Sequence, residues 1–336
     1  MGASTALALT DRGQQVTIFD ALPLGHTQGS SHGNSRIIRR AYPDPFYTEI
    51  MQKGYEMWSM LQTRTGESFV HETGLLYFGS RDSTELRDVI ASLTSLGVLN
   101  QVLEADQLPE GWRFQPNEIG VFTPEAGWVD ASRAVDLTMA LALDQGAEFR
   151  QARVDPGTIE GFDSTVVCAG PWIQDFVPVD VRVTTQTVAY VQLDAPVSGP
   201  VWIEDGPDFL YGFPSEQGQS TIKIGVHQPG VPTDPHRPER PVDPHMVELI
   251  KDFAHRRLGI ASPVIASTVT CLYTNTADED FRLGEFENGF WVSPCSGHGF
   301  KFGPWIGQLM ADLVEGKQTV ADWPRFCPLP EHRPQA

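Results

Sequence analysis

The chain has 336 residues and a formal net charge of −19, and 40% of its residues are hydrophobic and 20% are charged. This is the composition of a globular protein with one large domain or two smaller ones, and the acidic balance argues against nucleic acid or an anionic membrane as a partner. The sequence has no secretory signal and no apolar run of about 18 residues, and its four cysteines form no CxxC or Cys/His pattern. We therefore expect a cytoplasmic protein without a membrane span or a metal site.

The first twenty residues, MGASTALALTDRGQQVTIFD, look like the second half of a dinucleotide-binding βαβ unit. A helix is predicted over 2–12 and a buried strand over 15–20, which ends in Asp20. Gly2 fits the last glycine of a GxGxxG motif, and Asp20, 18 residues later, fits the acid that binds the adenosine ribose. The motif's first strand and first two glycines would precede Met1. Taken alone, the half-motif fits equally well any helix–strand unit that ends in Asp.

Helical and strand patterns alternate along the rest of the chain, which predicts an α/β or α+β class. Apolar residues recur at helical spacing in 43–63, 84–96, 131–143, 245–258 and 305–314. Strands are predicted at 74–80, 164–170, 187–193, 200–205, 220–226, 267–274 and 289–294. We expect the proline-rich stretch 229–244 to lie at the surface and the tail after 328 to fray.

Four segments carry groups suited to chemistry. The segment GSSHGNSRIIRRAY (29–42) places Arg36 and Arg39 three residues apart beside a Gly/Ser-rich loop. Arginines in this position can bind a carboxylate through two hydrogen bonds, or they can belong to a solvated basic loop. LYGFPS is followed by KIGVH, and in the strand over 220–226 Lys223 shares a face with Gly225. TCLYTNTADEDF (270–281) and CSGHGFKFG (295–303) follow, and the second is a glycine-rich turn that runs into a helix.

Together these segments resemble the monomeric sarcosine oxidase and N-methyltryptophan oxidase family of flavoenzymes. GSxHGxxRIIRxAY, YGFP…KxGxH, CLYTxTxDxxF and SGHGFKF stand in the family's order and at closely similar spacing, over nearly the whole chain. The resemblance implies a monomer whose doubly wound, Rossmann-like FAD domain is interleaved with a mixed-sheet substrate domain that has helices on one side. The FAD domain would comprise 1–64, 126–180 and 265–330, and the substrate domain 65–125 and 181–264.

The resemblance implies FAD joined covalently to Cys271, whose thiolate is chemically suited to attack the flavin 8α-methyl position. A buried cysteine alone is more often an apolar packing residue, and Cys295 does not match the family's motif. The SGHG turn would direct backbone N–H groups at the flavin, although such a turn also opens helices without any ligand. The other residues implied in cofactor binding are Gly2, Asp20, Ser30, His32, Arg36, Ala169, Gly170, Gly297, His298, Gly299 and Phe300.

The resemblance also implies a substrate that is a secondary-amine amino acid. Arg39 and Lys301 match the pair that holds its carboxylate, and Lys223 matches the lysine that assists oxygen by stabilising negative charge. Tyr211 and His227 match residues that shape the pocket and its proton balance, although a histidine like His227 can also be a satisfied core residue. The expected reaction converts an N-methyl amino acid and O2 into an imine and hydrogen peroxide.

Two departures from the family concern the FAD domain. The absent first strand would leave neighbouring strands unpaired, so either the true start lies upstream or the chain is a remnant that binds flavin poorly. Compared with the family, residues 153–172 replace the usual strand meander with a single loop, which would thin the cover over the adenine side of the cofactor.

Three other functions stay open from the sequence. The first is oxidation or dehydrogenation of a ring imino acid such as pipecolate or proline. The second is a flavin-free remnant that binds small carboxylates through Arg39 and Lys301. The third is an interaction protein without an active site, against which the joint presence of Cys271, Lys301, Lys223 and Arg39 argues.

Overall fold

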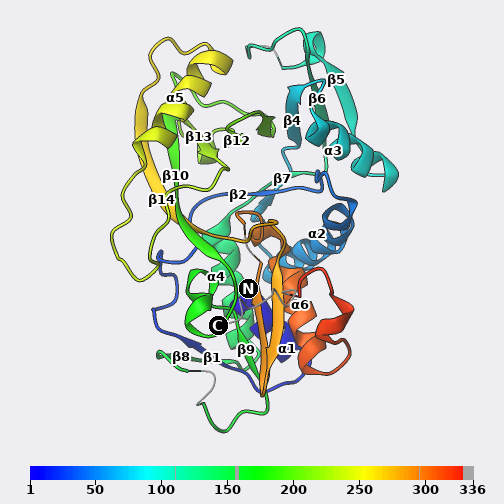
Figure 1. Cartoon of the computed structure of the whole chain (residues 1–336), viewed down its shortest axis with the longest axis vertical. Coiled ribbons are helices and arrows are strands. Elements are labelled where there is room, and N and C mark those ends of the chain that lie inside the picture. Colours follow the sequence, from blue (N-terminus) through cyan, green and yellow to red (C-terminus); the bar gives the residue numbers. More distant parts are fainter. Residues whose placement is uncertain (110, 156–158, 295, 328–336) are drawn as a thin grey trace, which may run out of the picture.

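A computed structural model describes residues 1–109, 111–155, 159–294 and 296–327, and it shows a mixed α/β protein with two parts, one above the other in Figure 1. The helices are α1 (Gly2–Asp11), α2 (Pro45–Thr65), α3 (Thr84–Ser95), α4 (Ala131–Asp144), α5 (Pro244–Leu258) and α6 (Gly303–Val314). The short 3-10 helices are η1 (Ala105–Gln107), η2 (Gly170–Asp175), η3 (Glu216–Gly218), η4 (Phe300–Phe302) and η5 (Val320–Asp322). The strands are β1 (Thr17–Asp20), β2 (Arg36–Ile38), β3 (Val70–His71), β4 (Leu75–Ser80), β5 (Gln101–Glu104), β6 (Glu118–Thr123), β7 (Gly127–Val129), β8 (Glu148–Gln151), β9 (Thr165–Val167), β10 (Arg182–Gln192), β11 (Val201–Asp205), β12 (Leu210–Phe213), β13 (Thr221–Val226), β14 (Ile265–Asn275), β15 (Arg282–Phe286) and β16 (Gly289–Ser293).

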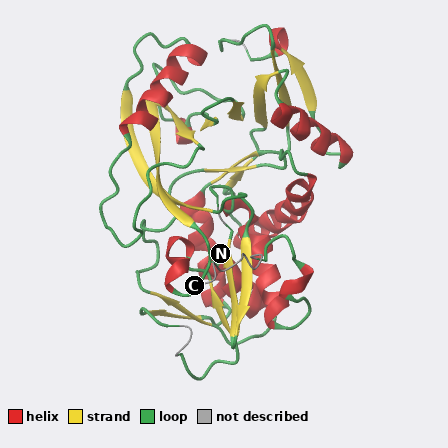
Figure 2. Ribbon diagram, in the orientation of Figure 1, coloured by secondary structure: helices red, strands yellow, loops and turns green. Residues whose placement is uncertain are grey.

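The upper part is built on an eight-stranded mixed sheet with the order β14-β10-β13-β12-β11-β4-β6-β5. The pair β11–β4 is parallel and its neighbouring pairs are antiparallel, so the expectation of a large mixed sheet is confirmed. The long strands β10 and β14 extend from this sheet down towards the lower part (Figures 1 and 2). They connect the sheet to the helices below.

The expectation that helices cover one side of this sheet is wrong. Leu75 and Tyr77 of β4 pack in the apolar cluster that includes α3, whereas Leu76 and Phe78 point the other way into the cluster with α5. Figure 1 shows α3 and α5 at opposite sides of the upper part. The physical reason is that β4 is apolar at consecutive positions, so both of its faces need cover.

The lower part gathers α1, α2, α4 and α6 around one apolar cluster. Helices α1 and α6 pack backbone to backbone at Gly307, where an added Cβ would lie 2.4 Å from the carbonyl oxygen of Ser4. An added Cβ at Gly2 would lie 3.9 Å from Cys168 Cβ, which is an ordinary contact. Of these two glycines, Gly307 is therefore the one whose lack of a side chain allows close packing with α1.

The lower strands form two separate small sheets. β1 pairs with β8 in one, and the other has the order β15-β16-β9. Within the described part of the chain, β1 has a second edge without a strand partner, and so does β9. Residues of both strands line the same cavity. The described residues between β8 and β9 form no further strand, in keeping with the expected single loop.

A buried ion cluster fastens α5 to the upper sheet. Arg257 donates through Nη2 to Glu118 Oε1 at 2.6 Å and through Nε to Glu204 Oε1 at 2.7 Å. The guanidinium also lies 5.3 Å from the centre of the Phe78 ring. This cluster lies outside the cavity wall, so its role is structural.

Candidate active site

A cavity of about 1410 Å³ runs between the two parts of the molecule. It is larger than the roughly 300–1,000 Å³ of ordinary small-ligand pockets, and extends from β1 past the start of α1 to the turn before α6. Every residue that the sequence analysis assigned to a site lies in its wall. These residues are Gly2, Asp20, Ser30, His32, Arg36, Arg39, Ala169, Gly170, Tyr211, Lys223, His227, Cys271, Gly297, His298, Gly299, Phe300 and Lys301.

The loop before β2 is held in shape by Arg36. Its guanidinium donates to the carbonyl oxygens of Ser30, His32 and Ser35, at 2.9, 2.7 and 2.8 Å. The Ser30 hydroxyl donates in turn to the carbonyl oxygen of Leu272 at 2.7 Å. Arg36 thus organises backbone, and the loop is fastened to β14 beside Cys271.

His32 presents a buried ring nitrogen, Nε2, without a hydrogen-bond partner among the described residues. Burial and then the charge of Arg36 lower the pKa of His32 to about 4, so the ring is neutral at pH 7. A buried polar atom without a partner costs stability unless a ligand satisfies it. His32 therefore has an open site for hydrogen bonding inside the cavity.

Two cysteines line the cavity at different places. Cys271 lies in β14 opposite Gln186 of β10, and Cys168 follows β9. Burial raises the pKa of the Cys168 thiol, which keeps it in the unreactive thiol form. Cys295 lies outside the described residues.

Two cations converge on one part of the wall. Lys301 donates to the Tyr42 hydroxyl at 2.9 Å and to the carbonyl oxygen of His298 at 2.7 Å, and the guanidinium of Arg39 lies over the Tyr42 ring. Arg39 Nη1 is buried and has no hydrogen-bond partner among the described residues. Burial and then the charge of Arg39 lower the pKa of Lys301 well below its usual value. Among the described residues neither cation has an ion-pair partner, so the site can accept an anion.

A chain of hydrogen bonds leads away from Lys301. The Tyr42 hydroxyl lies 3.4 Å from Nδ1 of His298, and Nε2 of that ring lies 2.9 Å from the carbonyl oxygen of Glu279. A carbonyl oxygen only accepts, so Nε2 carries the proton and Nδ1 accepts from Tyr42. Burial raises the pKa of Tyr42 to about 12 and lowers that of His298 well below its usual value. Both groups are therefore neutral supports for Lys301.

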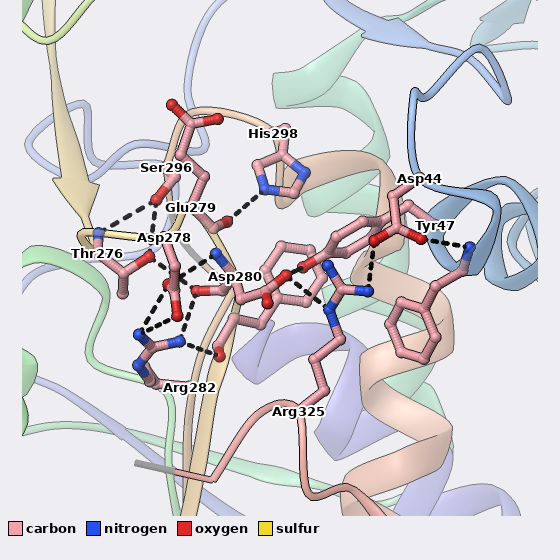
Figure 3. A network of polar contacts seen from close by, with 12 residues as sticks. Asp44, Tyr47, Thr276, Asp278, Glu279, Asp280, Arg282, Ser296, His298 and Arg325 are labelled. Atoms are coloured by element: carbon pink, nitrogen blue, oxygen red, sulfur yellow. Dashed lines mark hydrogen bonds and ion pairs between the residues drawn. The ribbon is translucent and has the colours of Figure 1, made fainter. Parts of the chain in front are cut away.

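The turn that carries His298 is braced by the network in Figure 3. Tyr47 donates to Asp280 Oδ1 at 2.7 Å, and Arg325 contacts the same oxygen at 2.8 Å and Asp44 at 2.6 Å. Ser296 contacts Thr276 through their hydroxyl groups at 3.1 Å. The network ties the start of α2 and the segment after α6 to the loop after β14.

The wall near Arg39 and Lys301 is aromatic. The pKa of Tyr211 is raised, first by burial and then by Cys271, and its hydroxyl is hydrogen-bonded to Tyr273. Gly297 has φ +74°, and an added Cβ would lie 2.2 Å from the Tyr273 ring, so only glycine fits there. Burial, then Arg39 and Lys301, lower the pKa of His227 to about 4, which leaves its ring neutral. Phe209 packs 5.3 Å from the His227 ring and has an unusual positive φ of 45°.

Asp20 and Lys223 stand at separate parts of the wall. Asp20 ends β1, accepts from the amide of Leu22 at 2.9 Å and keeps 44% of its side chain exposed. Lys223 lies in β13 and donates to the Ser35 hydroxyl at 2.9 Å. Burial and then Arg36 lower the pKa of Lys223 to about 7. The sequence analysis missed Ser35, Tyr42, Tyr190, Phe209, Glu216 and Tyr273. Five of them lie in or next to matched motif segments, which was the only signal available, and Tyr190 had no such signal.

These features fit a flavin dinucleotide. The cavity is long, and its wall includes the start of α1 and glycine-rich turns. In addition, His32 Nε2 is buried and has no hydrogen-bond partner in the part of the chain that the structure describes. Within the described residues no group of three or more His, Cys, Asp or Glu side chains is placed to hold a metal ion. None of the described helices is long and apolar enough to cross a membrane.

Comparison with known proteins identifies the kind of enzyme this chain resembles. A family model described as DAO, FAD dependent oxidoreductase, matches residues 1–313. Peroxisomal sarcosine oxidase of Homo sapiens is 28% identical over 347 residues, which cover 93% of this chain and 89% of the human protein. N-methyl-L-tryptophan oxidase of Yersinia pestis is 28% identical over 357 residues, which cover 97% of this chain and 95% of that protein. The resemblance predicted from the motifs is confirmed.

Solved structures share the fold. NikD, an amino acid oxidase of nikkomycin biosynthesis, has a TM-score of 0.83 and 22% identity, covering 98% of this chain and 96% of NikD. L-proline dehydrogenase of P. horikoshii has a TM-score of 0.80 and 19% identity, covering 94% of this chain and 91% of that enzyme. The mixed α/β fold class predicted from the sequence is confirmed.

Proposed function

Because this chain belongs to the DAO family of FAD-dependent oxidoreductases, we propose that it oxidises an N-methyl amino acid to an imine and passes the electrons to O2, giving hydrogen peroxide. The observation that carries the proposal is the convergence of Arg39 and Lys301 on one cavity wall without an ion-pair partner among the described residues. The carboxylate of an amino acid would satisfy both.

In this proposal Arg39 and Lys301 bind and orient the substrate. Binding the carboxylate at two points fixes the position of the amine relative to the other residues of the cavity wall. This orientation would supply much of the rate enhancement. Tyr42 lies beside both cations and shields them from water. The carboxylate would also raise the pKa of Lys301, because an opposite charge favours the ammonium form.

The substrate amine must be neutral to be oxidised, since its lone pair stabilises the developing iminium. Neutral His227 and the Tyr211–Tyr273 pair form the nearby wall, and we assign them to shaping the pocket and holding the amine's proton balance. Because these side chains are neutral, they add no further charge beside Arg39 and Lys301. This arrangement suits a substrate with one carboxylate and one secondary amine.

FAD would act as the two-electron acceptor. Imine formation removes two electrons and two protons from the amine, and O2 finally takes up the two electrons and two protons to form hydrogen peroxide. We propose that Gly2, Asp20, Ala169 and Gly170 hold its dinucleotide part and that Cys271 is its covalent attachment point. The flavin part would lie among Ser30, His32, Arg36, Gly297, His298, Gly299 and Phe300. Lys223 would stabilise negative charge on oxygen through its ammonium group.

We further propose the domain division 1–64, 126–180 and 265–330 for FAD and 65–125 and 181–264 for substrate. The enzyme would be a cytoplasmic monomer that uses O2 and a small amino acid as its reaction partners. The relatives include a peroxisomal enzyme, so localisation by fluorescent tagging tests the compartment directly.

The function is tested by peroxide release from FAD-loaded protein with a panel of amino acids. Sarcosine and N-methyl-L-tryptophan should give peroxide, and their unmethylated counterparts should not. Turnover confined to proline or pipecolate would move the assignment to a ring imino acid. Carboxylate binding without flavin or turnover would identify a flavin-free binding protein instead.

A further inference from the structure

Lys223 is tied through one hydroxyl to a buried carboxyl group. Its Nζ donates to the Ser35 hydroxyl at 2.9 Å and to the Ser35 carbonyl oxygen at 3.1 Å. The Ser35 hydroxyl donates its own proton to Glu216 Oε1. Ser35, Glu216 and Lys223 are only 0, 3 and 5% exposed, so water cannot replace these contacts.

The fold brings this set together from three separate regions. Glu216 lies in the loop that joins β12 to β13, so one hairpin carries both Glu216 and Lys223. Tyr190 of β10 is directly opposite Lys223 in the sheet, and its hydroxyl lies 3.5 Å from Glu216 Oε2. Among the described residues Glu216 makes polar side-chain contacts only with Ser35 and Tyr190. Glu216 forms no direct ion pair among the described residues, and its carboxyl group is linked to Lys223 through the Ser35 hydroxyl.

Burial and the Arg36 guanidinium both oppose the charge of Lys223 and favour the neutral amine. Glu216, and less strongly Cys271, favour the ammonium. A buried charge next to a carboxyl group is stabilised far more than one in water, because the local dielectric is low. The titratable and charged groups facing Lys223 are His32, Arg36, Tyr190, Glu216 and Cys271.

We propose that Glu216 is a positioning residue that keeps Lys223 protonated and fixes its direction through the hydroxyl of Ser35. The consequence for oxygen rests on the proposed oxidase function. The electrostatic link between the two side chains does not, because every group in it belongs to the chain. Glu216 itself does not line the cavity, so it acts through Lys223.

The link is tested first without turnover, by NMR titration of protein labelled with ¹³C at the lysine ε carbon. The Lys223 signal is assigned by its loss in Lys223→Met. In Glu216→Gln its titration midpoint should fall by about one pH unit, the size of shift a nearby charge causes. Glu216→Asp keeps the negative charge, so the titration midpoint of Lys223 in this variant should lie close to that of the unaltered protein. Glu285→Gln removes an exposed carboxylate elsewhere and should leave it unchanged.

A midpoint that is the same in Glu216→Gln and the unaltered protein would overturn the proposal. Should Glu216→Gln fail to fold, Ser35→Ala breaks the link while both charged groups remain, and it should move the midpoint in the same direction by less. An unchanged midpoint in a folded Ser35→Ala protein would refute the part assigned to the hydroxyl.

In the FAD-loaded enzyme the same variant should separate the two half-reactions. The rate of reoxidation by O2 should fall as the pH rises and Lys223 loses its proton, and in Glu216→Gln this fall should begin at a lower pH. Anaerobic reduction by substrate should stay within about twofold of its normal rate. A variant that alters only reduction would contradict the assignment. A shifted lysine midpoint in a protein that oxidises no amine would reject the oxidase function and leave the Glu216–Lys223 link standing.

Discussion

The guanidinium carbon of Arg39 lies 4.0 Å from the centre of the Tyr42 ring. The flat cation thus stacks on an aromatic face, while Nη1 is buried and no described residue hydrogen-bonds to it. Stacking holds the guanidinium without neutralising it. Arg39 is therefore preorganised to bind a carboxylate with both of its charged edges.

Replacing Arg39 with Met should weaken substrate binding strongly. Loss of a buried, hydrogen-bonded charge partner costs about 2–5 kcal/mol, which corresponds to a fall in kcat/KM of roughly 30-fold or more. Steady-state peroxide assays measure it, with Arg40→Lys as the control. Arg40 is next in sequence, contacts Thr48 and Gln52 and does not line the cavity, so its KM should stay near normal. Equal effects of the two changes would refute the carboxylate grip.

Replacing Cys271 with Ser should abolish covalent flavin. Flavin fluorescence that survives denaturation on a gel reports the bond, and it should vanish in Cys271→Ser because a hydroxyl is a far weaker nucleophile than a thiolate. Cys168→Ser is the matched control, since Cys168 lines the same cavity and burial raises its pKa. Fluorescence that persists in Cys271→Ser would place the attachment elsewhere or exclude it.

Elements with a strong local signal could be predicted from the sequence. The predicted helices lie close to their observed positions, since sequence-local caps such as Asp44, Ser83 and Asp130 mark three of the helix starts. The strands β2, β3 and β7 were missed because two or three residues are too short for a period-two pattern. The longer strands β5, β6, β8, β12 and β15 were not predicted either.

Which face of a strand meets which helix was harder to predict. Leu75 to Phe78 are all apolar, so the pattern contains no polar face, and only the tertiary arrangement shows that α3 and α5 take opposite sides. Similarly, Ser35 and Glu216 are polar residues in loops. Nothing local distinguishes them from solvated residues until the fold places Lys223 against them.

Stability of the flavin-free protein should fall in mild acid. Burial lowers the folded-state pKa of His227 to about 4, below the roughly 6.5 of an unfolded chain. The unfolded state therefore binds the proton first, so the contribution is fully present above about pH 6.5 and is lost as the pH falls towards about 4. The free energy of unfolding, measured in urea, should change less between pH 7 and pH 4.5 in His227→Gln than in the unaltered protein, by about 2 kcal/mol. Parallel pH curves for the two proteins would contradict the buried neutral ring.

Breaking the Arg257 cluster should cost stability without affecting the cavity. Arg257→Met leaves the buried Glu118 without its cation and leaves the buried Glu204 with only the more exposed Arg256, 3.4 Å away, a loss of about 3–5 kcal/mol. Adding Glu118→Gln and Glu204→Gln to the same protein should recover part of it, because the unpaired charges are then gone. Urea denaturation measures both steps. No recovery in the triple variant would show that packing of the arginine stem, rather than charge, carries the stability.

A strand supplied between β1 and β9 should improve retention of FAD. Residues of both strands line the cavity, and each strand has one edge without a strand partner within the described residues. Burial lowers the pKa of the Met1 amino group, and Met1 lines the same cavity. An added segment ahead of Met1 that pairs with both edges would satisfy their amide and carbonyl groups and move the buried amino group away. The flavin-to-protein ratio after desalting, and gel fluorescence, should both rise relative to the chain without the segment. The control is an extension of equal length with prolines at alternate positions, which cannot pair. Equal gains from both extensions would mean that added length, rather than strand pairing, supports the cofactor.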